Sequence, residues 1–323
     1  MTLAPTAPID SGLREAVGNL LWRSFAAVGV MPSAPSAGDS ASAARLKQVV
    51  FTVTECSRTT LLNPGFDALV PKLEAYDQEL HGFAYEGAGV GLAALDCLRP
   101  RKNRTAALAS GPGARHVFGI YLGAGMCLAR MWRNPESFRR RIGDPLLSWL
   151  ILDGYGFYKG FFAYERYVHY RQVPVHLYGY GRRVFDQGVG RAIWFGADAD
   201  VDRVAAIIGA FSPQRQADLW SGVGFACGYS GGIERSALDA LPALADRHRG
   251  HLAVGAAISA KARHLGGNPA SHNELACEVL CGTTSQQASE IADAAVRGIP
   301  SGNDVPAHAL WRQRVLQEFR SPC

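Results

Sequence analysis

The sequence predicts an all-α protein made of repeated helical hairpins with a period of about 31–36 residues. A Gly-x-Gly motif recurs inside apolar stretches, and its second glycine falls at positions 89, 125, 156, 190, 224 and 255. Apolar side chains between these motifs recur at helical spacing, and no stretch alternates as a strand-rich fold requires. A period in the thirties indicates stacked supersecondary units. We therefore expect an α-solenoid-like array of the TPR or Sel1 type, either open or closed and compact.

Composition bounds the class of protein. The 323 residues are 48% hydrophobic and 19% charged, which suffices for a buried core. The net charge of +5 comes from short basic clusters, such as Arg139-Arg140-Arg141, that suit solvated helix ends, so no nucleic-acid partner is expected. The longest uncharged apolar run, about Val117 to Ala129, is shorter than the roughly 20 residues of a membrane span. Seven cysteines without a Cys-x-x-Cys pair favour a reducing compartment, so we expect a cytoplasmic protein.

The first part of the chain differs from the rest. Residues 1–48 are predicted to form an N-terminal helix, Ser11 to Val30, followed by a flexible linker rich in Pro, Ser, Ala and Gly, Pro32 to Ala44. Lys47 to Thr54 carries β-branched residues and is expected to be a short strand or an extended arm. Residues 49–323 are then expected to be a single helical-repeat domain.

Each unit of that domain has two predicted helices. In the clearest one, a helix over Asp202 to Phe211 is followed by a Ser212-Pro213 turn and by a glycine-bearing helix that Gly231 stops. The next unit is predicted to run Glu234 to Asp246 and His251 to Leu265. Towards the C-terminus, Ser271-x-x-Glu274 and Thr284-x-x-Gln287 match the capping box, and a last helix is expected from about Ala307 to Phe319.

The glycine pairs have two interpretations. A phosphate-binding loop would need a strand before the glycines and an acidic residue about 20 positions later, and no strand precedes Gly87. A glycine inside a helix costs about 1 kcal/mol relative to alanine, so repeated pairs need a compensating gain. Close approach of helix backbones supplies that gain. We therefore predict a helix-crossing contact and no cofactor.

The residue just before the first glycine suggests a polar strip. Four of the six residues at this position are polar although the helices are apolar: Glu86, Leu122, Asp153, Gln187, Ser221 and Leu252. Buried polar groups must be paired or face a wet cavity. One interpretation is mutual hydrogen bonding that fixes the stack. The other is a ligand groove in which Glu86 and Asp153 are candidate acid–base catalysts and Gln187, Ser221 and the adjacent Trp220 bind ligand.

An aromatic segment, about residues 155–182, is the second candidate region. It holds seven of the eleven tyrosines and is longer than a simple connection, so it is predicted to be an insertion. Aromatic walls with a few cations suit an extended apolar ligand, and Tyr155, Tyr158 and Lys159 are candidate ligand-binding residues. The alternative is an aromatic cluster that only stabilises the insertion. A metal site is not predicted, because His272, Cys277 and Cys281 lack the partners that zinc requires.

Several runs carry a resemblance to a known family. They are Phe83-Ala84-Tyr85-Glu86-Gly87, Leu152-Asp153-Gly154-Tyr155-Gly156-Phe157, Phe185-Asp186-Gln187-Gly188-Val189-Gly190-Arg191 and Ala217-Asp218-Leu219-Trp220-Ser221-Gly222-Val223-Gly224, with shorter runs near Gly111 and Cys277. Over about residues 60–320 the chain resembles an uncharacterised actinobacterial family, UnbL-like, whose members sit in enediyne antibiotic gene clusters. The resemblance implies a role in the maturation of the polyene made by the enediyne polyketide synthase. It carries over no catalytic residue.

These observations lead to one functional expectation and two rivals. The first is an accessory protein of enediyne core biosynthesis that binds or acts on the hydrophobic polyene intermediate. The rivals are a non-catalytic helical scaffold for pathway proteins and a carrier that sequesters the product. An enzyme should have an aromatic-lined pocket that touches Glu86, Asp153 or Gln187, whereas a scaffold should have an open groove and fully paired polar residues.

Overall fold

The computed structural model describes residues 41–300 and 305–319, and within these ranges all regular structure is helical and no strand occurs. The predicted all-α class is therefore confirmed. The predicted helix over Ser11 to Val30 lies outside the described residues. The first described helix, α2 (Ala41–Leu62), contains the end of the predicted linker and the whole of Lys47 to Thr54. The expected strand at Lys47 to Thr54 is wrong.

Tertiary packing explains why this β-branched stretch is helical. Val49, Val53 and Cys56 are buried at helical spacing where α2 packs on the next long helix. The hydroxyls of Thr52 and Thr54 donate hydrogen bonds to the carbonyls four residues earlier, so neither is left unsatisfied. The burial of one helical face outweighs the weak strand preference of these residues.

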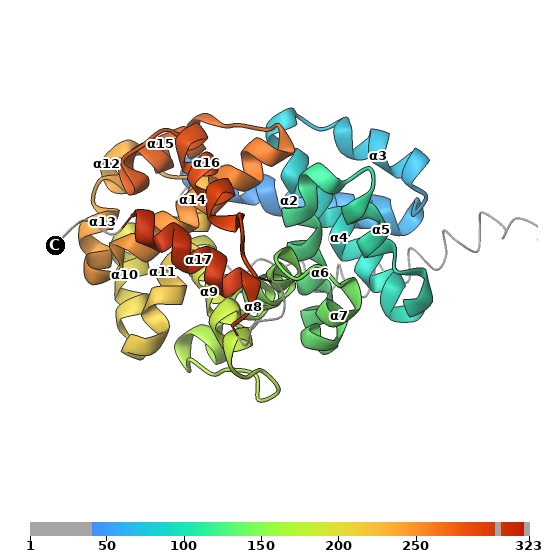
Figure 1. The fold of residues 1–323 in the computed structure, drawn as a ribbon, viewed down its shortest axis with the longest axis horizontal. Coiled ribbons are helices and arrows are strands. Elements are labelled where there is room, and N and C mark those ends of the chain that lie inside the picture. Colours follow the sequence, from blue (N-terminus) through green and yellow to red (C-terminus); the bar gives the residue numbers. More distant parts are fainter. Residues whose placement is uncertain (1–40, 301–304, 320–323) are drawn as a thin grey trace, which may run out of the picture.

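Seven long helices form the centre of the molecule, and each packs on the next along the chain. They are α2, α4 (His81–Leu98), α6 (Val117–Arg130), α8 (Leu150–Phe162), α9 (Tyr180–Gly196), α11 (Pro213–Ser230) and α14 (Arg249–Gly266). Shorter helices lie between them in sequence (Figure 1): α3 (Phe66–Glu74), α5 (Arg104–Ser110), α7 (Pro135–Ile142), α10 (Val201–Gly209), α12 (Arg235–Leu238) and α13 (Leu241–Ala245). The predicted helix over Glu234 to Asp246 is thus two short helices.

The glycine pairs lie where the long helices cross. A Cβ atom added at Gly123 would overlap the carbonyl oxygen of Glu86 on the preceding helix, and one added at Gly125 would overlap that of Ile151 on the following helix. The first glycine of each pair therefore faces the preceding helix and the second faces the following one. The same arrangement recurs at Gly87 and Gly89, Gly154 and Gly156, Gly188 and Gly190, and Gly222 and Gly224. The predicted helix-crossing contact is confirmed.

This contact pattern corrects the last copy of the motif. Gly255 faces the carbonyl of Ser221, as a first glycine does, and Gly224 faces the carbonyl of Leu252. In every other pair the second glycine faces the residue two positions before the polar-strip residue of the next helix. Val254, and not Leu252, therefore occupies the polar-strip position of α14. A first glycine faces the carbonyl of the polar-strip residue on the preceding helix, as Gly123 faces that of Glu86. Gly87 faces the carbonyl of Val53, which places Val53 at this position of α2.

The chain ends with α15 (Ser271–Cys281), α16 (Ser285–Val296) and α17 (Ala307–Glu318). The capping box at Thr284 is confirmed in its first half, because the Thr284 hydroxyl accepts a hydrogen bond from the Gln287 amide. The box at Ser271 is wrong. The helix begins after Ala270, and Glu274 instead accepts hydrogen bonds from the amide and hydroxyl of Ser285. Glu274 thus ties α15 to the start of α16.

The connection between α8 and α9 differs from the predicted insertion. Residues 155–162 belong to α8, and Tyr180 is the first residue of α9, so the irregular part is shorter than residues 155–182. It contains one π-helical turn, η5 (Glu165–His169), followed by a loop. Trp132, Tyr170, Val175 and Tyr178 all have exposed apolar side chains, and the last three lie in this connection.

The row of long helices bends back on itself. The Arg45 side chain of α2 donates to the carbonyl of Ser230 at the end of α11, and Arg263 of α14 donates to the carbonyl of Glu79, just before α4. Figure 1 shows α17 crossing in front of α9 and α11. None of the described helices has both the length and the apolar composition needed to span a bilayer.

Candidate functional site

One residue of each long helix lies on the concave side of this bend. We call these residues the inner row: Val53, Glu86, Leu122, Asp153, Gln187, Ser221 and Val254. An α-helix turns about 100° per residue, so the two glycines of a pair lie on nearly opposite sides of their helix. The residue before the first glycine projects between them, to the same side in every helix. All seven side chains are buried.

The clearest proof that the inner row faces a common interior is a group of three charges. Arg191 Nη1 donates a hydrogen bond of 2.7 Å to Asp153 Oδ1, and Arg191 Nη2 lies 3.6 Å from Glu86 Oε1. Glu86 is on α4 and Arg191 on α9, although α6 and α8 intervene along the chain. The three residues are at most 5% exposed. One guanidinium therefore serves two buried carboxyl groups.

Aromatic rings hold the guanidinium in place. Arg191 Cζ lies 4.9 Å from the ring centroid of Phe157 on α8 and 5.4 Å from that of Phe225 on α11. Phe157, Arg191 and Phe225 each follow their inner-row residue by four positions, so the same helical geometry that aligns the inner row also aligns them. The cation–π contacts compensate part of the cost of burying the charge.

Burial of the two carboxyl groups has a large electrostatic effect. Loss of solvent raises the pKa of Glu86 to about 7, because Arg191 opposes this effect only in part and Asp153 adds to it. Burial also raises the pKa of Asp153 above its usual range, against the opposing effect of Arg191. Asp153 makes the short hydrogen bond with Arg191, whereas Glu86 is too far away for a good one. A pKa of about 7 makes Glu86 a group that exchanges a proton near neutral pH.

An apolar cavity of about 60 Å³ lies beside Glu86 and Arg191. Its walls come from α2, α4, α6, α8 and α9, and five of the lining residues are phenylalanines: Phe83, Phe157, Phe161, Phe162 and Phe195. Val50, Thr54, Met126 and Phe162 are only partly buried, and so they form its rim. The cavity thus combines an aromatic wall with one carboxyl group whose pKa is near 7, an arrangement that suits proton transfer to an apolar ligand.

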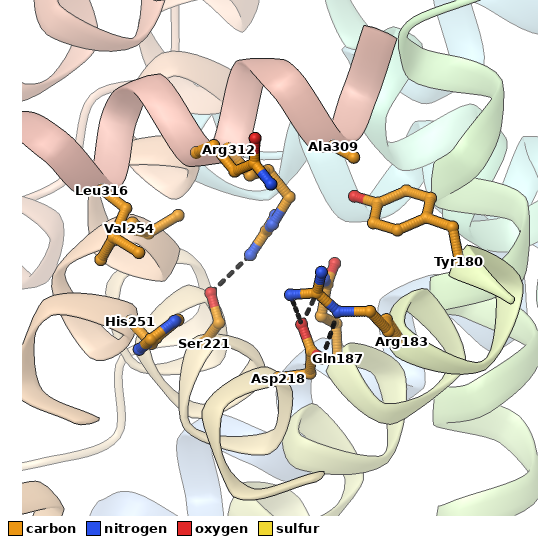
Figure 2. Close-up of a pocket in the computed structure, with 11 residues that line it drawn as sticks. Tyr180, Arg183, Gln187, Asp218, Ser221, His251, Val254, Ala309, Arg312 and Leu316 are labelled. Atoms are coloured by element: carbon orange, nitrogen blue, oxygen red, sulfur yellow. Dashed lines mark hydrogen bonds and ion pairs between the residues drawn. The ribbon is translucent and has the colours of Figure 1, made fainter. Parts of the chain in front are cut away.

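The other polar members of the inner row contact different partners. Gln187 Nε2 donates to Asp218 Oδ1 at 3.3 Å, and Asp218 also accepts two hydrogen bonds from Arg183. Ser221 Oγ accepts a hydrogen bond from Arg312 of α17. Figure 2 shows these residues around a second pocket, which lies between α17 and the inner row. Gln187 and Ser221 therefore belong to a polar pocket, separate from the phenylalanine-lined cavity.

With this geometry established, comparison with known proteins places the chain. A family model described as "Protein of unknown function (DUF1702)" matches residues 16–319. The chain belongs to the DUF1702 family. That description assigns no reaction. No curated protein and no solved structure matches the chain.

The remaining predicted site residues of this DUF1702 chain lie elsewhere. Tyr155, Tyr158 and Lys159 are on α8 but line neither pocket. Lys159 is six positions after Asp153, about 240° around the helix, and therefore faces away from it. Its amine lies 3.9 Å over the ring of Trp132. Trp220 is buried in α11 and also lines neither pocket. In the described part of the DUF1702 chain, no group of three or more His, Cys, Asp or Glu side chains is placed to hold a metal ion.

The sequence did not predict a role for Arg191 and Arg312, the two arginines that contact polar residues of the inner row. Arg191 stands four residues after Gln187 in an otherwise apolar stretch, which puts it on the same helix face as Gln187. That spacing was a usable signal. Arg312 had none, because α17 is remote in sequence and its approach to Ser221 depends on how the chain folds back.

Proposed function

We propose that the protein binds an apolar unsaturated chain in the phenylalanine-lined cavity and that Glu86 transfers a proton to or from it. The observation that carries the proposal is the contact of the cavity with the Glu86–Arg191 pair. A carboxyl group with a pKa of about 7 is present in both protonation states at neutral pH, and it can act as acid or base. Asp153 positions Arg191 and thereby sets the charge beside Glu86.

In the pathway that the sequence resemblance implies, the ligand is the linear polyene of enediyne biosynthesis. A cavity of about 60 Å³ has room for only a few water molecules, so it would take one end of a polyene. The phenylalanine rings offer flat apolar surfaces that suit conjugated double bonds.

A pair of variants on one helix tests the role of the cavity. Val50→Trp should fill the rim of the cavity, because Val50 lines it and is partly exposed. Phe51→Trp is the matched control, because Phe51 is 63% exposed on the same helix and lines neither pocket. In a producing strain, Val50→Trp and Glu86→Gln should abolish the enediyne product and Phe51→Trp should not. A normal titre from folded Val50→Trp and Glu86→Gln variants would rule out the proposal.

A scaffold is the second candidate, and two observations favour it. Asp153, Gln187 and Ser221 all have hydrogen-bond partners within the chain, as a purely structural strip would. In addition, the α8–α9 connection exposes Tyr170, Val175 and Tyr178, which suit a partner protein of the same pathway. If this candidate is correct, Val175→Asp should abolish the product while Val50→Trp leaves the titre unchanged.

For the architecture, we propose that each long helix, together with the short helix before it where the described chain has one, forms one unit of an α-solenoid-like array that closes on itself. The recurring glycine–carbonyl contact and the hydrogen bonds from α2 to α11 and from α14 to the segment before α4 support this arrangement. A closed array should unfold in one cooperative transition, which circular dichroism and intrinsic fluorescence would report at the same denaturant concentration. Separate transitions by the two signals would argue for an open array.

A further inference from the structure

The pocket between α17 and the inner row has a separate chemical character. Its volume is about 40 Å³, and its walls come from α9, α11, α14 and α17. Figure 2 shows the guanidinium groups of Arg183 and Arg312 directed into it from α9 and α17. The hydroxyl of Ser221 and the side chain of Gln313 also line it. The pocket therefore gathers hydrogen-bond donors from two sides.

The charges of the pocket walls do not balance. Arg183 is committed to Asp218, to which it donates two hydrogen bonds of 2.9 and 3.3 Å. Arg312 contacts no carboxylate within ion-pair distance among the described residues, and its hydrogen-bond partner there is the neutral hydroxyl of Ser221. His251 lines the pocket in its neutral form, because burial lowers its pKa to about 4. Two cations thus face one carboxylate.

Carboxyl groups outside the pocket do not neutralise this excess positive charge. Asp153 of the inner row also acts electrostatically on Arg312, but its hydrogen bond goes to Arg191, which also serves Glu86. Tyr180 is neutral at physiological pH, because burial raises its pKa above the usual range, and its hydroxyl pairs with His308 of α17. An anion in the pocket would complete the hydrogen bonds of Arg312 and balance its charge.

We propose that this pocket is a binding site for a carboxylate group, with Arg312 as its main cation and Ser221 and Gln313 as neutral donors. The planar guanidinium matches the two oxygens of a carboxylate. A volume of about 40 Å³ holds roughly three water-sized groups, which is the size of a carboxylate and less than that of a phosphate. The site is independent of the phenylalanine-lined cavity and of any proton transfer there.

Thermal unfolding of the full chain with added anions tests the site. Sodium acetate should raise the unfolding temperature of the wild type more than sodium chloride does at equal ionic strength. Inorganic phosphate, which stabilises proteins nonspecifically by exclusion from their surface, should raise it equally in the wild type and in Arg312→Gln. Arg312→Gln should weaken acetate binding at least about tenfold, since a charge-assisted pair is lost. Arg314→Gln is the matched control on the same helix, because Arg314 donates to the carbonyls of Ala295 and Arg297 and does not line the pocket. Equal effects of acetate and chloride would overturn the proposal, as would unchanged acetate binding in Arg312→Gln.

Two further variants cover the case in which Arg312→Gln does not fold. Arg312→Lys keeps the charge but loses the planar fork, and Ser221→Ala removes the neutral donor together with the oxygen that accepts from Arg312, so each should weaken acetate binding severalfold. If both variants bind acetate as tightly as the wild type does, the proposed carboxylate site is ruled out. Octanoate distinguishes the sources of the carboxylate. Tighter binding of octanoate than of acetate identifies the end of an acyl chain, and equal binding identifies a small free acid.

Discussion

Glu86 makes a quantitative prediction about stability and pH. Its pKa in an unfolded chain is near 4.5, and burial in the folded protein raises it to about 7. At a pH below the unfolded value Glu86 is protonated in both states, and its contribution to stability is fully present. As the pH rises, the unfolded chain loses its proton first, so the folded state is progressively destabilised until the pH passes about 7.

The size of the effect follows from the two pKa values. Their difference corresponds to about 3 kcal/mol in total, most of which is lost between about pH 5 and about pH 8. Glu86→Gln has no proton to lose. The free energy of unfolding of the wild type should therefore fall by about that amount relative to Glu86→Gln over this range.

Urea unfolding at several pH values, followed by circular dichroism, measures this difference. Glu318→Gln, at an exposed position of α17, is the control for exchanging a carboxylate for an amide. The free energy of unfolding of the wild type minus that of Glu86→Gln should fall from about pH 5 to about pH 8 and then level off. If the two curves run parallel from about pH 5 to about pH 8, Glu86 does not titrate in this window, and the reasoning behind its acid–base role fails.

Three further predictions concern the same interior. Gly123→Ala should destabilise the protein by about 2 kcal/mol or more in urea unfolding, because the added Cβ would meet a helix backbone at under 3.0 Å. The control Gly209→Ala has open space around the new Cβ and should be neutral or stabilising by up to about 1 kcal/mol. Equal effects of the two substitutions would contradict the packing role of Gly123. Arg191→Met should cost about 3–5 kcal/mol at neutral pH and less at about pH 5, where Glu86, with a pKa of about 7, is protonated in any case. A loss that does not depend on pH would count against this electrostatic explanation. Burial lowers the pKa of Lys159 to about 8. The free energy of unfolding of the wild type should therefore rise relative to that of Lys159→Met as the pH increases from about 8 towards 10.5. A fall over this range would show that the folded protein stabilises the charged form of the amine.

The glycine spacing was a reliable guide to the fold because it reflects a geometric need. Only glycine allows a backbone carbonyl of the next helix to come so close, so the spacing marks each crossing. The copy in α14 was placed two residues out, because Ala257 stands where the second glycine would be and one glycine alone cannot say which of the two it is. Local preference also failed at Lys47 to Thr54, where packing of α2 decides the structure.

The arrangement of the candidate site could be anticipated only in part. Glu86 and Asp153 were selected because they are charged residues in apolar helices, and the structure brings them together on one arginine. Tyr155, Tyr158 and Lys159 were assigned to a ligand wall by composition, which ignores direction. Counting 100° per residue would have favoured Phe157 and Phe161 instead. Arg312 depends on the fold of the whole chain and could not be placed from the sequence.

The glycine crossings also govern how a ligand could reach Glu86. Between adjacent long helices from α4 to α14 the backbones meet directly, so no layer of side chains is there to rotate and open a passage. The wall behind the inner row is therefore stiff, and entry is confined to the rim that the partly buried side chains of Val50, Thr54, Met126 and Phe162 form. Substitutions on that rim should govern the rate of ligand entry, whereas substitutions at the crossings act on stability.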